Sequence, residues 1–133
     1  AVCSGIRDSM IWQSDKGAKV QWTAMGDGCV DLQTLFKEWS DACPETPVQI
    51  ETISGFAKEF PYLEKDFWPP YSTIRPDDYS CFLALARKGK TLAPFSAPDG
   101  VDKKKAQQDY QLTELEKSFV YCRENLGIGR KSA

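Results

Sequence analysis

The sequence predicts an α/β fold with parallel strands and a long helix at its C-terminal end. The prediction depends on the order of three segments. A strand-like stretch at 2–12, VCSGIRDSMIW, comes first, an amphipathic helix follows, and the β-branched run VQIETI at 48–53 comes directly after the short turn 45–47. A strand, a crossover helix and a second strand in this order form a βαβ unit, in which the two strands pair in parallel.

The helix of this unit carries the strongest periodic signal in the chain. Its apolar residues recur at helical spacing and form one stripe, which consists of Leu32, Leu35, Phe36, Trp39 and Cys43. Asp31 is a favourable N-cap residue, and Pro44 ends the helix. The strand that follows is mostly apolar on both faces, as is typical of parallel strands covered by helices.

Two segments of the N-terminal part are predicted to be irregular. Residues 13–22 form a loop or a short hairpin around Asp15-Lys16-Gly17. Residues 56–74 are rich in aromatic residues and proline and contain FPYLEKDFWPPY. Loops of this length are uncommon and are often functional. The alternative is that these aromatic side chains only seal one end of the fold or a subunit contact.

Two further helices are predicted in the C-terminal half. Pro76 favours the first position of one helix, and Gly89 is a natural stop for it. Residues 90–102 contain prolines and glycine and are predicted to form a linker. A last helix is predicted over about 103–125, on the spacing of its apolar residues.

Composition excludes several classes of function. The net charge is −2 and the sequence pI is about 5.2, so nothing favours nucleic acid or an anionic membrane as a partner. The basic run Lys103-Lys104-Lys105 leads into a helix with many acidic residues and is interpreted as a solvated face. The chain has no histidine, which excludes Ser–His and Cys–His catalysis and any His-based zinc site within it.

The cysteines indicate a reducing compartment. The chain has five, at positions 3, 29, 43, 81 and 122, and no two of them have CxxC spacing. An odd number of scattered cysteines favours free thiols that act as small apolar residues, as in cytoplasmic proteins. No apolar run approaches the roughly 20 residues that span a bilayer.

Glu51 is the first candidate site residue, because it lies in an apolar strand. Side chains alternate along a strand, so Glu51 shares a face with Gln49 and Ile53, close to the C-terminal end of the strand. Burying an isolated carboxylate costs several kcal/mol unless it is paired or bound to a metal. Glu51 is therefore either a metal ligand or general base, or the partner of a base such as Arg7 in a structural ion pair.

A second group of candidates lies near the end of the first predicted strand. Arg7 can hold an anionic or polyhydroxylated substrate, and Asp8 either orients Arg7 or pairs with it structurally. Trp22, ahead of the Gly26-Asp27-Gly28 loop, is the third candidate for contact with a substrate. The purely structural interpretation of the Arg7–Asp8 pair remains open.

Several stretches together have the order and spacing of a known family. They are GIRDS at 5–9, AMGDGCVDLQTLF at 24–36, VQIETISGF at 48–56, FPYLEKDFW at 60–68, FLALARKGK at 82–90 and LEKSFVYCRENLGIG at 115–129. The chain resembles the C-terminal part of the xylose isomerase-like α/β barrels, the sugar phosphate isomerase/epimerase family. The resemblance implies the C-terminal portion of a (β/α)8 TIM barrel, with the last βα units in 1–89 and the linker and C-terminal helix in 90–133.

The resemblance also implies a chemistry. Members of this family typically bind one divalent metal, often Mn²⁺ or Mg²⁺, and isomerise or epimerise sugars through an enediolate. Glu51 matches the last metal-binding glutamate, and Arg7 matches a position near the oxygens of a sugar or polyol substrate. The family often has His-x-His-x-x-Asp where this chain has Cys3-Ser4-Gly5-Ile6-Arg7-Asp8, so its metal-binding histidine falls on Gly5.

Three hypotheses follow. The chain is the C-terminal part of an isomerase or epimerase barrel, and the missing N-terminal part is expected upstream because the sequence begins with Ala1 rather than Met and runs directly into a predicted strand. Alternatively, it is a non-catalytic relative that binds a carbohydrate-like ligand and has lost the metal site. Thirdly, it is a small α/β module that assembles with itself or with a partner, because two strands alone do not make a stable sheet.

Overall fold

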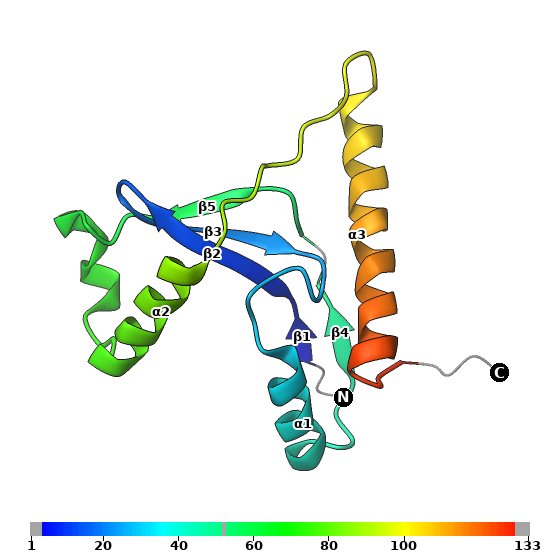
Figure 1. Ribbon diagram of the computed structural model, residues 1–133, viewed down its shortest axis with the longest axis horizontal. Coiled ribbons are helices and arrows are strands. Elements are labelled where there is room, and N and C mark those ends of the chain that lie inside the picture. Colours follow the sequence, from blue (N-terminus) through cyan, green and yellow to red (C-terminus); the bar gives the residue numbers. More distant parts are fainter. Residues whose placement is uncertain (1–3, 52, 130–133) are drawn as a thin grey trace.

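The computed structural model describes residues 4–51 and 53–129. In chain order the elements are β1 (Ser4–Ile6), β2 (Asp8–Ser14), β3 (Gly17–Thr23), α1 (Leu32–Ala42), β4 (Val48–Ile50), β5 (Ala57–Phe60), two short 3-10 helices η1 (Lys65–Phe67) and η2 (Pro69–Tyr71), α2 (Pro76–Lys88) and α3 (Lys103–Asn125). Figure 1 shows the strands at the centre, α1 and α2 beneath them, and α3 along one end.

The strands form two small sheets rather than part of a barrel. β1 pairs with β4 in parallel, and β2, β3 and β5 form an antiparallel sheet in the order β2-β3-β5. The predicted TIM-barrel portion is therefore wrong for the described residues, which contain only one parallel pair and no barrel closure. The parallel pair itself is the predicted βαβ crossover, with α1 between its strands.

The barrel prediction failed because the stretch 2–12 is not one strand. The described part of it divides at Arg7 into β1 and β2, and β2 pairs over its whole length with β3, from Asp8↔Thr23 to Ser14↔Gly17. A tight hairpin closes this pairing, at a small entropic cost because the strands are adjacent in sequence. The chain thus leaves the parallel sheet immediately after β1.

The segment 56–74 also differs from the prediction of a long irregular loop. Residues Ala57–Phe60 form β5, which adds to β3 with Gln21 opposite Ala57 and Ala18 opposite Phe60. The remainder contains η1 and η2. Its aromatic side chains contribute to a first core, which lies between α2 and the strands β2 and β3. This core is built on Ile11, Ala18, Tyr62 and Ala86.

A second core joins the βαβ unit to the C-terminal helix. Asp31 caps α1 as predicted, because its carboxylate accepts a hydrogen bond from the Thr34 backbone N–H at 3.1 Å. The core is built on Met25, Leu32, Phe36 and Cys122, and Ile6, Val48 and Ile50 of the parallel strands pack against it. Alternation along β4 therefore turns Gln49 and Glu51 to the opposite face.

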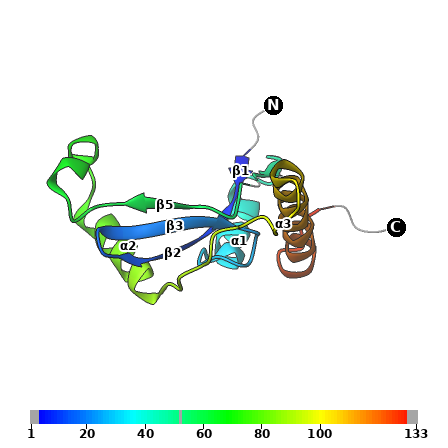
Figure 2. The same cartoon turned by 90° about the horizontal axis from the view of Figure 1, so that it is seen from above.

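The helices α2 and α3 begin and end where the sequence predicts. Pro76 is the first residue of α2 and Gly89 is its C-cap, and α3 spans the predicted 103–125. Figure 2 shows α3 beyond one end of the antiparallel sheet, beside β1 and α1. In the described part of the chain, no helix is long and apolar enough to cross a membrane.

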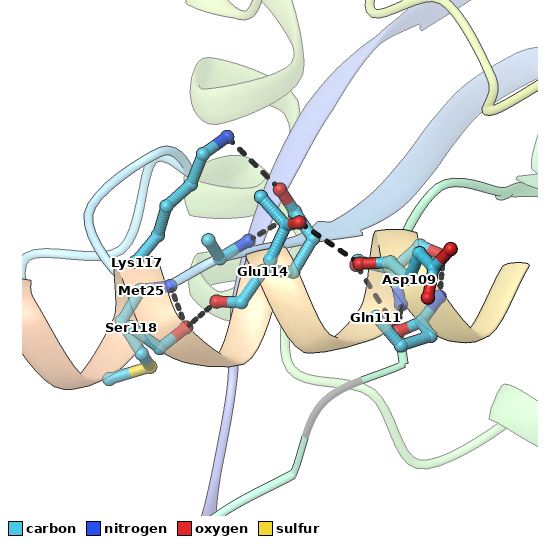
Figure 3. A network of polar contacts seen from close by, with 9 residues as sticks. Met25, Asp109, Gln111, Glu114, Lys117 and Ser118 are labelled. Atoms are coloured by element: carbon cyan, nitrogen blue, oxygen red, sulfur yellow. Dashed lines mark hydrogen bonds and ion pairs between the residues drawn. The ribbon is translucent and has the colours of Figure 1, made fainter. Parts of the chain in front are cut away.

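Buried polar contacts fix α3 to the loop after β3. The Ala24 N–H donates to the Glu114 carboxylate at 3.1 Å, and the Met25 N–H donates to the Ser118 hydroxyl at 3.0 Å (Figure 3). Ser118 in turn donates to the Glu114 carbonyl at 2.7 Å, and Glu114 also pairs with Lys117 at 3.2 Å. Glu114 and Ser118 are both buried, so their hydrogen bonds with the Ala24 and Met25 N–H groups are shielded from water.

Candidate functional site

Four side chains meet where the two sheets join, and we call them the Arg7 cluster: Arg7, Trp22, Glu51 and Phe56. Arg7 forms an ion pair with Glu51, and its guanidinium carbon lies 5.8 Å from the centroid of the Trp22 ring. The rings of Trp22 and Phe56 are tilted by 47° with centroids 5.4 Å apart. Three of the four residues, Arg7, Trp22 and Glu51, are candidates that the sequence predicted from separate stretches.

Strand pairing explains why Arg7 and Glu51 meet. Arg7 follows β1 and Glu51 follows β4, and the two strands are parallel, so their C-terminal ends lie together. The Glu51 N–H donates to the Ile6 carbonyl at 2.8 Å, which extends the parallel pairing beyond β4. Both side chains emerge on the face opposite the second core, because Val48 and Ile50 occupy the core face.

Strand pairing also places the two aromatic rings. Gln21 of β3 lies opposite Ala57 of β5 in an antiparallel ladder, so the next pair along the ladder is Trp22 with Phe56. Opposed residues in such a ladder have side chains on the same face and within contact distance. The cation–π contact of Arg7 with Trp22 then links the antiparallel sheet to the ion pair.

Gly5 provides the space that Glu51 occupies. A Cβ atom at Gly5 would lie 2.5 Å from Glu51 Oε1 and 2.9 Å from Glu51 Cδ. The Glu51 side chain therefore crosses over the backbone of β1 to reach Arg7. The glycine at position 5 therefore admits the carboxylate.

The cluster is accessible to solvent. The Arg7 and Glu51 side chains are 36% and 48% exposed, and Phe56 is 47% exposed. The expectation that the Glu51 carboxylate is buried is therefore wrong, because Glu51 lies on the face of the parallel pair opposite the second core. An exposed ion pair contributes only about 0–1 kcal/mol to stability, so opening it to admit a ligand costs little.

Asp8 does not join the cluster, although it is adjacent to Arg7. It is 1% exposed, and its carboxylate accepts hydrogen bonds from the backbone N–H groups of the loop after β3 and of its own neighbour. The donors are Ser9 at 2.7 Å, Gly26 at 2.9 Å, Gly28 at 3.0 Å and Val30 at 3.3 Å. Asp8 thus holds the Gly26-Asp27-Gly28 loop, and both of its oxygens are already used.

The described residues do not fit the divalent metal site that the resemblance implies. Among residues 4–51 and 53–129, no group of three or more acidic or cysteine side chains is placed to hold a metal ion. The two carboxylates predicted near this site are both engaged, Glu51 by Arg7 and Asp8 by backbone N–H groups.

Two contributors to the cluster could not be identified from local sequence. The sequence predicts Phe56 in an irregular loop, because its role depends on the pairing of β5 with β3, across more than thirty positions of sequence. Gly5 appeared only as the position of a missing histidine. The segment AKEF, which follows Phe56, does not alternate apolar and polar residues, so no local pattern predicts a strand there.

Comparisons with known proteins add no further assignment. No protein-family model, no curated protein and no solved structure matches the chain. The likeness to sugar isomerases therefore remains a prediction from the quoted motifs.

Proposed function

We propose that the chain binds a sugar or a polyol at the Arg7 cluster. The observation that supports this most directly is the meeting of Arg7, Glu51 and Trp22 on one accessible face, from three different strands or strand ends. The likeness of the sequence to sugar isomerases supports the same class of ligand. The opposite charges of Arg7 and Glu51 cancel, so the cluster favours a neutral polyhydroxylated ligand over a strongly anionic one.

The functional groups of the cluster complement those of a sugar. The guanidinium of Arg7 supplies several N–H donors in a fixed plane, and the carboxylate of Glu51 supplies acceptors beside them. Neighbouring hydroxyl groups of a sugar each contain a donor and an acceptor and can bridge such a pair. The faces of Trp22 and Phe56 offer apolar area for the C–H groups of the ring.

Isothermal titration calorimetry with a panel of aldoses, ketoses and alditols tests this proposal. Glu51→Gln keeps the shape of the side chain but removes its charge, and we expect it to weaken binding about tenfold, as the loss of a charged hydrogen-bond partner does. The matched control is Glu38→Gln, at an exposed position of α1. Binding that is equal in Glu51→Gln and the control would refute the cluster as the site.

A second candidate function is proton transfer next to a carbonyl, as in isomerases and epimerases. The observation that favours it is an accessible carboxylate beside a guanidinium. Glu51 would remove a proton from the carbon next to the carbonyl, and Arg7 would stabilise the negative oxygen of the resulting enediolate. Return of the proton from Glu51 to the former carbonyl carbon, with transfer of the hydroxyl proton to the former carbonyl oxygen, isomerises the sugar.

Deuterium exchange separates catalysis from binding alone. A catalytic Glu51 would incorporate solvent deuterium into a bound sugar at the carbon next to its carbonyl, detected by NMR in D₂O. The exchange should disappear in Glu51→Gln. If the wild-type chain binds the sugar without incorporating deuterium, its function is binding alone and Glu51 is not a catalytic base.

The cysteines support a reducing location for this activity. The described thiols of Cys29, Cys43, Cys81 and Cys122 are all free. Free thiols persist in the cytoplasm and are oxidised or paired in secreted proteins. Burial raises the pKa of the Cys122 thiol, which keeps it in its neutral, unreactive form within the second core.

A further inference from the structure

A separate apolar groove lies on the other side of β4 from β1. It has a volume of about 890 Å³ and is bounded by α1, β4 and α3. Its walls include Phe36 and Trp39 of α1, Val48 and Ile50 of β4, and Phe119 and Arg123 of α3. Figure 1 shows β4 between β1 and α3. Residues from both faces of β4, Val48, Gln49 and Ile50, line the groove, so it follows the edge of β4 that β1 does not occupy.

The backbone of this edge has hydrogen-bonding groups without partners. The Glu51 N–H is directed to β1, where it donates to the Ile6 carbonyl. Because successive residues of a strand direct their backbone groups to alternate edges, the N–H and C=O groups of Val48 and Ile50 are directed to the opposite edge. Within residues 4–51 and 53–129, no hydrogen bond is made to these groups on that side.

We propose that the groove binds an extended peptide segment of a partner protein, which adds to β4 as a third strand. The unpaired groups of Val48 and Ile50 specify an extended backbone as the ligand, because only a strand can match their spacing. A third strand would also complete a sheet that has too few strands to be stable alone. Exposed strand edges are the sites where such addition occurs.

The residues that line the groove indicate which side chains the partner segment should have. The groove is lined mainly by apolar residues, and Phe119 remains 47% exposed within it. Alternate residues of an added strand would point into this apolar space, so valine, isoleucine or leucine is expected at every second position. Among the residues of 4–51 and 53–129 that line the groove, Arg123 is the only charged one, so an acidic residue is expected at the end of the segment beside it.

Fluorescence anisotropy with a labelled synthetic peptide tests the proposal on the full chain. The peptide alternates valine and threonine and carries one terminal glutamate. The control peptide has the same side chains but is N-methylated at every second amide, which removes the donors for β4. We expect saturable binding of the first peptide and none of the second. Equal binding of both peptides would overturn strand addition.

Variants of α3 locate the binding. Phe119→Ser should weaken binding about tenfold, as the loss of a central apolar anchor does. The matched control is Val120→Ser, because Val120 is 42% exposed on the same helix and does not line the groove. Arg123→Glu should bind a peptide whose glutamate is replaced by lysine better than it binds the original peptide.

Two results would refute the proposed partner. One is equal weakening by Phe119→Ser and Val120→Ser. The other is self-association of the chain in sedimentation analysis that Phe119→Ser abolishes and the peptide does not compete with, because a second copy would then occupy the groove. Circular dichroism establishes that each variant retains its helices, so that loss of folding is not mistaken for loss of binding.

Discussion

Glu51 reaches Arg7 only because residue 5 is glycine. The Glu51 carboxylate lies where a side chain at position 5 would begin, and the ion pair depends on that space. A residue that has no side chain therefore determines where the Glu51 carboxylate lies. This dependence can be tested without altering any residue of the Arg7 cluster.

Gly5→Ala should weaken sugar binding about tenfold without destabilising the chain. The new Cβ displaces the flexible end of Glu51, while alanine is favoured over glycine in a strand by roughly 0.5–1 kcal/mol. Calorimetry gives the binding constant and thermal unfolding gives the stability. Unchanged binding in Gly5→Ala would mean that the position of Glu51 over β1 is irrelevant to the ligand.

Asp8→Asn should destabilise the fold by about 2–3 kcal/mol, because it removes a buried charged acceptor of several backbone N–H groups. The free energy of unfolding in urea measures the loss. Asp15→Asn, in the exposed hairpin turn, is the control and should change stability by less than about 0.5 kcal/mol. Equal effects of the two substitutions would show that Asp8 does not hold the loop.

At the scale of single elements, α1 depends on its N-cap. The Thr34 backbone N–H donates to Asp31 and holds the pKa of that carboxyl below its ordinary value of 3.8. The folded state therefore favours the ionised form. The resulting stability is present above the ordinary pKa and is lost as the pH falls through the lower folded value.

Asp31→Asn should remove this dependence on pH while it preserves the cap, because asparagine also caps helices and does not titrate. Unfolding in urea at a series of acidic pH values checks the prediction. The difference in stability between the two chains should shrink as the pH falls. A constant difference across the acid range would contradict the assigned role of Asp31.

The attachment of α3 gives a second prediction for an element. Ser118→Ala leaves the buried Met25 N–H without an acceptor, which should cost about 1–3 kcal/mol. Hydrogen exchange at Met25 should accelerate more than exchange within β2 and β3. Gln107→Ala, at an exposed position of the same helix, is the control. If exchange at Met25 accelerates equally in Gln107→Ala, the hydrogen bond to Ser118 is not what protects Met25.

Elements with local signals were predicted well, and elements defined by distant partners were not. Asp31, Pro76 and Gly89 mark the ends of helices within a few residues, so α1 and α2 follow from the sequence. The strand β5 has no such markers and is stabilised by its pairing with β3. The same difference explains the site, because Arg7 and Glu51 follow from the βαβ crossover but Phe56 requires the β3–β5 ladder.

At the scale of the whole molecule, the two sheets are joined at Arg7, and the parallel pair has two distinct exposed surfaces. The parallel pair carries the polar Arg7 cluster on one face, and the edge of β4 faces the apolar groove. The barrel that the motifs predicted would have required further parallel strands beside this pair. The described chain instead uses the hairpin of β2 and β3, which is favoured because its partners are close in sequence.

The central claim is that the Arg7 cluster binds a sugar or polyol. The most direct test is a titration of the ¹⁵N-labelled chain with the sugar panel, followed by the side-chain N–H signals of Arg7 and Trp22 in two-dimensional NMR spectra. Both signals should shift together and saturate, and Glu51→Gln should weaken the effect. Saturable shifts confined to other residues, or no shift with any sugar, would contradict it.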